Sequence, residues 1–280
     1  MWKHRRHGGI GSYAADVPHG LSPMERAGQK QEVPMRSLHQ YLLLAFVGLG
    51  LVASVSQAAV IYEDTFGRNG TLNGSTPSPT TTGGATWTSH TAAIVTSSAT
   101  NTASKSSTTY AEAAGYLPLT LDGVGTYTLS ATIAKPASGG YGLVLAFWGG
   151  TFDVDSNPYS SSKIIAGMGW EPNTSRAVVS RSGTNTSVWS SNLGGTDTIT
   201  IALNSVTGAV VITDTLGYYT GKAASSFTLT SAQMTSINAV MIGAHQDTGT
   251  FSNFTLTYVP EPASLALLSL GALALFRRRR

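Results

Sequence analysis

The 280-residue chain contains no cysteine, and charged residues make up only 11% of it. Without cysteine it can form no disulfide scaffold, no cysteine-ligated zinc site and no iron–sulfur cluster, and it has no thiol nucleophile. Typical soluble domains contain about 25% charged residues, so this chain is unusually poor in charge. Its hydrophobic fraction of 41% is still high enough for a packed core, which excludes a wholly disordered chain.

The formal net charge of +3 does not belong to the part of the chain that we expect to fold. Six of the 17 basic residues precede residue 37, and four more are the terminal arginines. The segment 59–258 holds seven basic and ten acidic residues, a difference of −3. Because nucleic-acid binding needs lysine and arginine clustered on the folded domain, the sequence predicts no nucleic-acid partner.

The apolar run near the N-terminus is too short to span a bilayer, which takes about 20 residues. Within residues 35–58, Arg36 precedes the apolar stretch 41–55, and Ser56-Gln57-Ala58 places small residues before a cleavage site. We interpret 35–58 as a signal peptide that the general secretory machinery removes between Ala58 and Ala59. Residues 1–34 would then be a gene-model artefact or a disordered extension, and an extended n-region is the alternative.

Residues 259–280 combine three features in a fixed order. They are the triplet Pro260, Glu261, Pro262, then the apolar stretch 263–276, then Arg277, Arg278, Arg279 and Arg280. This order resembles the PEP-CTERM sorting signal of exosortase substrates in Gram-negative bacteria that make exopolysaccharide. The resemblance implies export, recognition of the triplet by a membrane exosortase, removal of the tail, and release to the cell surface or extracellular matrix. The apolar stretch is short for a permanent span, so we expect transient retention in the inner membrane, with the arginines on the cytoplasmic side.

Runs suitable for long helices are missing between these two signals. Instead Thr, Val, Ile and Tyr recur in short alternating stretches, which is typical of β-strands. We expect strands at 60–66, 86–95, 116–121, 127–134, 142–148, 163–170, 177–181, 196–204, 209–215, 226–230, 239–243 and 251–259. About a dozen short strands without helical spacers predict one all-β domain of two packed sheets at 59–258, a sandwich or jelly roll.

Three local features of these strands can be predicted. In 127–134, the alternation turns Leu129, Ala131 and Ile133 toward the core. The nearly continuous apolar stretch 142–148 should lie centrally in a sheet. The short loop 204–208, which ends in glycine, should join its flanking strands as a hairpin.

Short segments of the body resemble the jelly rolls of the concanavalin and laminin-G type that often precede such sorting tails. The segments are Asp64-Thr65-Phe66, Gly83-Gly84-Ala85-Thr86-Trp87, Tyr116-Leu117-Pro118-Leu119 and Gly249-Thr250-Phe251-Ser252-Asn253-Phe254-Thr255-Leu256. The resemblance implies that the first and last strands pair, which would place 60–66 beside 251–259.

We find no recognisable catalytic constellation in the body. Laminarinase-type enzymes on this fold carry Glu-x-Asp-x-x-Glu, which holds two carboxyl groups about 5–5.5 Å apart, and the chain has no such pattern. Glu63 and Asp64 are adjacent, so they would point to opposite faces of a strand, and Glu112 is isolated. His90 and His245 are the only histidines of 59–258, and no Gly-x-Ser-x-Gly elbow is present. We therefore expect no catalytic residues.

The best remaining polar constellation is Asp153, Asp155 and Asn157, whose side-chain oxygens recur at alternate positions as in a calcium loop. The EF-hand pattern is broken, because Pro158 stands at its glycine position and Ile164 at its bidentate acid. A Ca²⁺ site of another kind in a lectin-like loop and an ordinary polar turn both remain open. No other cofactor is expected.

Tyr159 and Trp170 flank this loop in the sequence and could stack on sugar rings. The alternative is that they pack in the core or at the rim of the sandwich, as large aromatic side chains usually do.

These observations favour a non-catalytic secreted surface or extracellular-matrix protein that exosortase sorts and that associates with exopolysaccharide. Two alternatives stay open. The first is a glucanase-like carbohydrate-active enzyme with an atypical site. The second is a purely structural coat or adhesion component that self-associates without binding a glycan.

Overall fold

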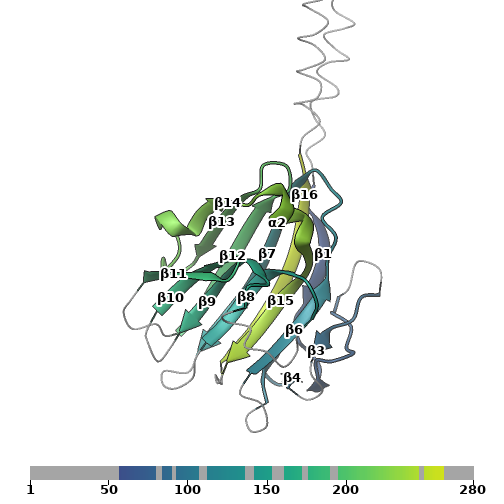
Figure 1. Cartoon of the computed structure of the whole chain (residues 1–280). Coiled ribbons are helices and arrows are strands. Elements are labelled where there is room, and N and C mark those ends of the chain that lie inside the picture. The colour runs from purple at the N-terminus through teal and green to yellow at the C-terminus, as the bar shows by residue number, and fades with distance from the viewer. Residues whose placement is uncertain are drawn as a thin grey trace, which may run out of the picture. The chain divides into compact units, whose positions relative to one another are not determined.

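The computed structural model describes residues 57–79, 84–89, 93–106, 112–135, 142–152, 161–171, 176–189, 195–245 and 249–261. These residues form two antiparallel β-sheets that pack face to face (Figure 1). Within these ranges the helical elements are the 3-10 helix η1 (Ala223–Ser225) and the short helix α2 (Ser231–Ser236), and neither is long and apolar enough to cross a membrane. The prediction of an all-β, two-sheet sandwich is confirmed.

The strand order places β16 and β7 side by side inside the larger sheet and β8 in the middle of the smaller one. The nine-stranded sheet runs β14 (Ser226–Thr228), β13 (Ala209–Asp214), β12 (Gly195–Asn204), β7 (Gly125–Lys135), β16 (Thr250–Pro260), β5 (Thr102–Lys105), β4 (Ile94–Ser97), β2 (Gly70–Thr71), with β1 (Ala59–Asp64) also on β16. The seven-stranded sheet runs β11 (Thr184–Trp189), β10 (Arg176–Arg181), β9 (Ile164–Glu171), β8 (Gly142–Gly149), β15 (Ile237–His245), β6 (Glu112–Pro118), β3 (Thr88–Ser89).

Several predictions about strand placement are confirmed. The first and last strands pair, with Ala59 opposite Tyr258. The stretch 142–148 is the central strand β8. The loop 204–208 joins β12 to β13 as an antiparallel hairpin, and Gly208 there adopts a φ of +72°, which favours glycine.

The single strand expected at 86–95 is wrong. Thr88 and Ser89 form β3 and pair with β6 in the seven-stranded sheet, whereas Ile94 begins β4 and pairs with β5 in the other sheet. The chain therefore changes sheets between residues 89 and 94. Hydrophobic periodicity does not reveal that the chain passes from one sheet to the other, because the residues before and after the crossing are both extended.

Among the described residues, five elements lie where no strand or helix was expected, and the 3-10 helix η1 is one of them. The strands β2, β5 and β11 consist largely of glycine, threonine, serine and asparagine, so they lack the apolar face that reveals a strand in a sequence. Helix α2 is short and polar, yet its start carries a capping box: Thr230 accepts from the backbone N–H of Gln233, and the Gln233 side chain accepts from the Thr230 backbone N–H.

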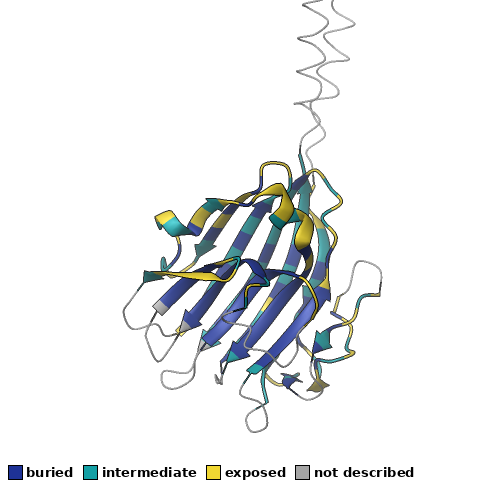
Figure 2. Cartoon of the chain, viewed as in Figure 1, coloured by how far each residue is buried: buried dark blue, intermediate teal, exposed yellow. Residues whose placement is uncertain are grey.

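The main core lies between the two sheets and follows the predicted alternation (Figure 2). Leu129, Ala131 and Ile133 of β7 are fully buried, as expected, while the intervening threonines and serine are half-buried. Ile199 and Ile201 of β12 lie in the same layer. Burying each such aliphatic side chain contributes about 1.5–3 kcal/mol, so this alternation supplies much of the stability of a domain without disulfides.

Asp64, at the end of β1, ties the first loop to the core. Its carboxylate is fully buried and accepts from both Arg68 terminal nitrogens at 2.7 and 2.8 Å. It also accepts from Trp87 Nε1 at 2.7 Å and from the Phe66 backbone N–H at 2.8 Å. Trp87 packs edge-on against Phe254 of β16, with ring centroids 5.1 Å apart. A single buried charge thus connects the first strand, its loop and the last strand.

Replacing Asp64 with alanine should lower the free energy of unfolding by about 3–5 kcal/mol, because it leaves the buried Trp87 N–H without its acceptor and the Arg68 guanidinium with Ser75 Oγ in place of its ion pair. Glu63→Ala, at the half-buried neighbouring position of β1, is the matched control and should change stability by about 0.5 kcal/mol at most. Urea unfolding measures both values. Equal losses in the two variants would contradict the anchoring role of Asp64.

Candidate functional site

The two ends of the sandwich differ, and strand register defines them. At one end Pro260 pairs with Gly125, and Asn204 pairs with Thr126. We call this the tail end; it also holds the loops 119–124 and 205–208 and helix α2 (Figure 1). At the opposite end, the far end, Thr250 pairs with Ala134, and Gly195 pairs with Lys135.

The sorting triplet begins inside the sheet. Strand β16 continues through Pro260, and the Glu261 backbone N–H donates to the Val124 carbonyl at 2.9 Å. Asn204 Nδ2 donates to Glu261 Oε1 at 3.0 Å. Pro262 and Arg277, Arg278, Arg279 and Arg280 lie outside the described residues. The described part of the triplet is therefore bound to the sandwich by both backbone and side chain.

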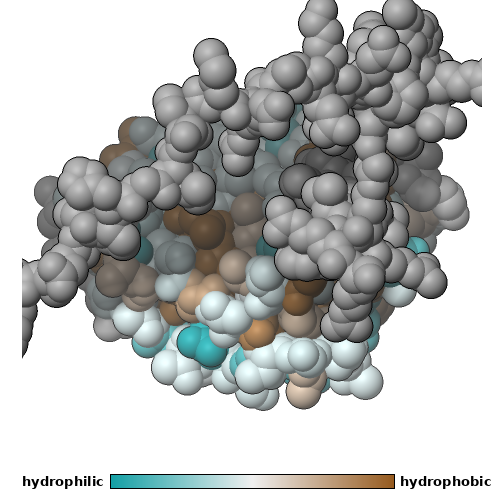
Figure 3. All heavy atoms as spheres, turned by 90° about the horizontal axis from the view of Figure 1, so that it is seen from above, coloured by the Kyte–Doolittle hydropathy of each residue, from teal (hydrophilic) through white to brown (hydrophobic). Residues whose placement is uncertain are grey.

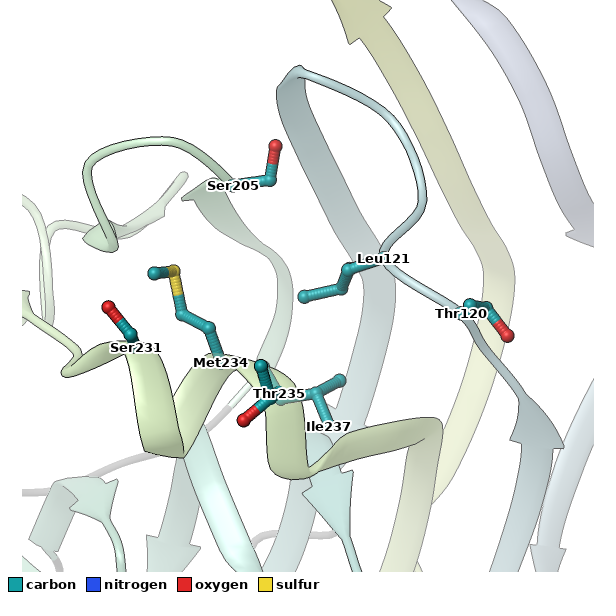
Figure 4. A pocket seen from close by; sticks show the side chains of 7 residues that line it. All are labelled: Thr120, Leu121, Ser205, Ser231, Met234, Thr235 and Ile237. Atoms are coloured by element: carbon teal, nitrogen blue, oxygen red, sulfur yellow. The ribbon is translucent and has the colours of Figure 1, made fainter.

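A pocket of about 320 Å³ opens beside these residues at the tail end. Seen from this end, apolar residues lie recessed behind residues of intermediate and hydrophilic character (Figure 3). The pocket is lined by Thr120, Leu121, Ser205, Ser231, Met234, Thr235 and Ile237. Leu121 points into the space above α2, and Met234 rises from the helix into the same space (Figure 4). None of the lining side chains is charged, so the pocket suits a neutral ligand better than an ion.

Not all hydroxyl groups of the pocket are available to a ligand. Ser205 Oγ donates to the Gly123 carbonyl at 2.6 Å and accepts from the Gly125 N–H at 3.0 Å. The Thr235 hydroxyl donates to the Ala232 carbonyl at 3.0 Å and keeps only its acceptor capacity. A ligand would thus meet an apolar floor and a sparse set of hydrogen-bonding groups.

Sequence reasoning missed this pocket because three segments far apart in the chain build it: the β6–β7 loop, the β12–β13 loop and α2 with the start of β15. One signal was readable. The spacing of Thr230 and Gln233 is that of a capping box, which marks the start of the helix that carries Met234 and Thr235.

At the far end, two aspartates at neighbouring positions of β12 and β13 have opposite environments. Asp197 is almost fully buried, and its Oδ1 accepts from the Thr215 N–H at 2.9 Å and from the Thr215 hydroxyl at 2.6 Å. Its Oδ2 has no hydrogen-bond partner. Burial raises the pKa of Asp197, and the negative charge of Asp214 raises it further.

Asp214 is the more strongly hydrogen-bonded of the two. Its carboxylate accepts from the Thr220 hydroxyl at 2.7 Å, from the Thr220 N–H at 2.9 Å and from the backbone N–H groups of Tyr218 and Tyr219. Burial alone would raise the pKa of Asp214, but these hydrogen bonds outweigh it and hold the pKa below its ordinary value. Both oxygens are occupied by donors, so Asp214 serves to fix the loop 214–220.

His245 and Glu112 form the pair closest to an acid–base arrangement among the described residues. They lie opposite each other on β15 and β6, with His245 Nδ1 3.0 Å from Glu112 Oε1. Burial lowers the pKa of His245, and the positive charge of Lys105 lowers it further, which favours the neutral imidazole. Glu112 is isolated in the sequence, and only the register between β6 and β15 brings it to His245.

The residues singled out for calcium or sugar binding are mostly outside the described ranges. These are Asp153, Asp155, Asn157 and Tyr159, so the Ca²⁺ site and the polar turn both remain predictions. The described residue that precedes them, Phe152, is 36% exposed and stacks on Tyr116, with ring centroids 5.0 Å apart. Within the described ranges, no group of three or more histidine, aspartate or glutamate side chains could hold a metal ion.

Trp170 lies at the end of β9 away from the point where that loop enters the strand. It is fully buried in the main core, and it pairs with Leu143 at the far end of β9, whereas the loop leads into the opposite end of the strand at Ile164. Its ring therefore offers no exposed face for a sugar.

The predicted cleavage site fits the strand boundaries. Ala58 and Ala59 are exposed, and Ala59 is the first residue of β1. Removal of the chain up to Ala58 would leave every residue of β1 in the sandwich.

Comparison with known protein families gives a match at the C-terminal segment of the chain. Residues 259–280 match the PEP-CTERM protein-sorting motif. This match indicates an exported, surface-sorted protein. No curated protein sequence matches the chain.

Solved structures resemble the sandwich only in architecture. Arcelin-5, a lectin-like defense protein from Phaseolus vulgaris, is 12% identical, with a TM-score of 0.40; the match covers 59% of this chain and 89% of that one. The CBM2 module of the Lactobacillus casei BL23 phage J-1 evolved Dit is 9% identical, with a TM-score of 0.42, covering 72% and 96%. The sialidase of Trypanosoma rangeli in complex with the inhibitor DANA is 12% identical, with a TM-score of 0.43, covering 80% and 37%.

The chain spans 16% of a further sialidase that it matches at 9% identity, with 61% of this chain covered and a TM-score of 0.38. Of these neighbours, one is described as lectin-like, one is a CBM2 module and two are sialidases. At such identities and TM-scores they carry no inference about ligand or activity.

The opposite pKa shifts of the two aspartates predict opposite pH effects on stability. Asp197 has a raised pKa, so its ionisation costs stability as the pH rises through that value. Asp197→Asn should therefore abolish a gain in stability that the wild-type chain shows on acidification from about pH 7 to about pH 4.

Asp214 has a lowered pKa, so its stabilisation is complete above its unfolded pKa and is lost as the pH falls through the folded value. Asp214→Asn should lower the free energy of unfolding by about 1–3 kcal/mol at neutral pH, and the deficit should shrink below about pH 4. Urea unfolding over a pH series measures both variants. Curves parallel to that of the wild type would contradict the assignment.

Proposed function

We propose that this chain is a non-catalytic protein that a Gram-negative bacterium exports through the general secretory machinery and processes with an exosortase. The tail 262–280 holds it briefly in the inner membrane, and the processed protein then associates with exopolysaccharide at the cell surface or in the extracellular matrix. The observation that carries the proposal is the match of residues 259–280 to the PEP-CTERM sorting motif.

A neutral polymer is the partner class that the tail-end pocket fits best. Its volume of about 320 Å³ lies at the lower end of the range of small-molecule sites, enough for about one sugar ring. Its lining combines apolar side chains with hydroxyl groups and has no charge. The low charge of the whole body also disfavours partners that bind through ion pairs.

The enzyme alternative is supported by one observation, the His245–Glu112 pair, because a neutral imidazole beside a carboxylate can act as a general base. The sequence carries neither the Glu-x-Asp-x-x-Glu pattern nor a Gly-x-Ser-x-Gly elbow that would accompany such a base in a known hydrolase. We therefore keep the non-catalytic role as the proposal and let a turnover assay decide.

Replacing Arg277, Arg278, Arg279 and Arg280 with serine should reduce the processed, surface-located form by at least about fivefold, because the tail loses the charges that hold it on the cytoplasmic side. Cell fractionation and intact-mass measurement of the secreted form report both localisation and tail removal. Lys222→Ser, a basic residue of the body, is the control and should be processed normally. Recovery of the wild-type chain only in the cytosol would contradict the proposal.

Thr235→Tyr, which fills the pocket, should weaken binding to the organism's exopolysaccharide by about tenfold, the loss of some 1.4 kcal/mol. Ser236→Tyr is a matched control on the same helix: both hydroxyls are exposed and donate to the carbonyl three residues earlier, but only Thr235 lines the pocket. Calorimetric titration measures binding.

The same preparations should release no reducing sugar from a polysaccharide panel. Turnover that His245→Asn abolishes would overturn the non-catalytic role. Equal binding by Thr235→Tyr and Ser236→Tyr would remove the pocket as the contact.

A further inference from the structure

The contacts that bind Pro260 and Glu261 form a prepared site, which we call the motif seat and define as residues 123–125 with Asn204. The first component is glycine. A Cβ on Gly125 would overlap the Val259 carbonyl and come within 2.8 Å of Pro260 Cα. A Cβ on Gly123 would likewise overlap the Tyr258 ring. Glycine at both positions lets the end of β16 lie directly on this loop.

The second component is an oriented amide. Asn204 Oδ1 accepts from the Val206 N–H at 3.0 Å, from the Thr207 N–H at 2.8 Å and from the Thr207 hydroxyl at 3.0 Å. These bonds belong to the β12–β13 turn and fix the amide plane. Nδ2 is thereby turned toward Glu261 Oε1, at 3.0 Å, at little further cost in side-chain entropy.

The third component is an oriented carbonyl. Val124 O accepts from the Tyr258 hydroxyl at 3.0 Å and from the Glu261 N–H at 2.9 Å. Ser205 ties the loop of Val124 to the β12–β13 turn through its bonds to Gly123 and Gly125. The donor for the carboxylate and the acceptor for the backbone are therefore held in one rigid frame.

An enzyme that recognises the triplet has to contact the groups that the seat already occupies. These groups are the backbone of Pro260 and Glu261 and the Glu261 carboxylate. We infer that the folded sandwich binds the first two residues of its own sorting motif in competition with the processing enzyme, so that their release from Asn204 and Val124 limits the rate of tail removal. This inference rests on the proposed function.

Asn204→Asp tests it selectively. The aspartate keeps an oxygen for the N–H groups of the turn but places a carboxylate against Glu261, so the seat is lost while the turn is kept. Asn238→Asp is the matched control: its Nδ2 donates to the Gly150 carbonyl at 2.8 Å, also at the tail end, without touching the motif. Pulse-chase labelling in the producing bacterium should show about three- to tenfold faster tail removal for Asn204→Asp, as expected for loss of one partly exposed charged hydrogen bond, and an unchanged rate for Asn238→Asp.

A second measurement is independent of processing. In the full-length chain purified from cells without exosortase, the Glu261 amide should exchange its hydrogen faster in Asn204→Asp than in the wild type or Asn238→Asp. Amides of β7 and β12 away from the turn should be unaffected.

The outcomes separate this inference from the proposed function. If the wild-type chain is processed, a rate for Asn204→Asp equal to or below the wild-type rate overturns the inference and leaves the proposed function intact. If the wild-type chain is never processed, the proposed function fails, and the exchange of the Glu261 amide still decides whether the seat exists. Unchanged exchange overturns it.

Discussion

Strand β16 is the element on which the rest of the structure depends, because its backbone hydrogen bonds join β1, β5 and β7 in one sheet. Phe251, Phe254 and Leu256 place its inner face in the main core. The same strand ends in the first residues of the sorting motif. Pairing of β16 therefore completes the sheet and positions the start of the motif at the same time. In a chain in which β16 has not yet paired, Pro260 and Glu261 are not held against the sandwich.

Predictions from sequence succeeded where one side of a strand is apolar. The alternation in β7 and the apolar run of β8 each report a local pattern that burial dictates. The pairing of β1 with β16 came from a family resemblance, since no local pattern specifies a partner 190 or so residues away. Polar edge strands such as β11 were missed, because their neighbours in the sheet, rather than their side chains, hold them.

The candidate sites were harder to predict for the same reason. Pro260 and Glu261 could be found as a linear motif. The hydrogen bond between Asn204 and Glu261 could not, because Asn204 lies 57 residues earlier, in the β12–β13 hairpin. The pairing of Glu112 with His245 and the burial of Trp170 likewise follow from sheet register. The residue types can be read from the sequence, but which side chains come into contact depends on the pairing and packing of the two sheets.

The pairing of Ala59 with Tyr258 places the predicted start of the mature chain beside the residue that precedes the sorting motif. Attachments at both termini would therefore act on the same end of the sandwich. The far end, with the aspartate pair and the His245–Glu112 pair, lies at the other end of the strands, so neither attachment would lie over it.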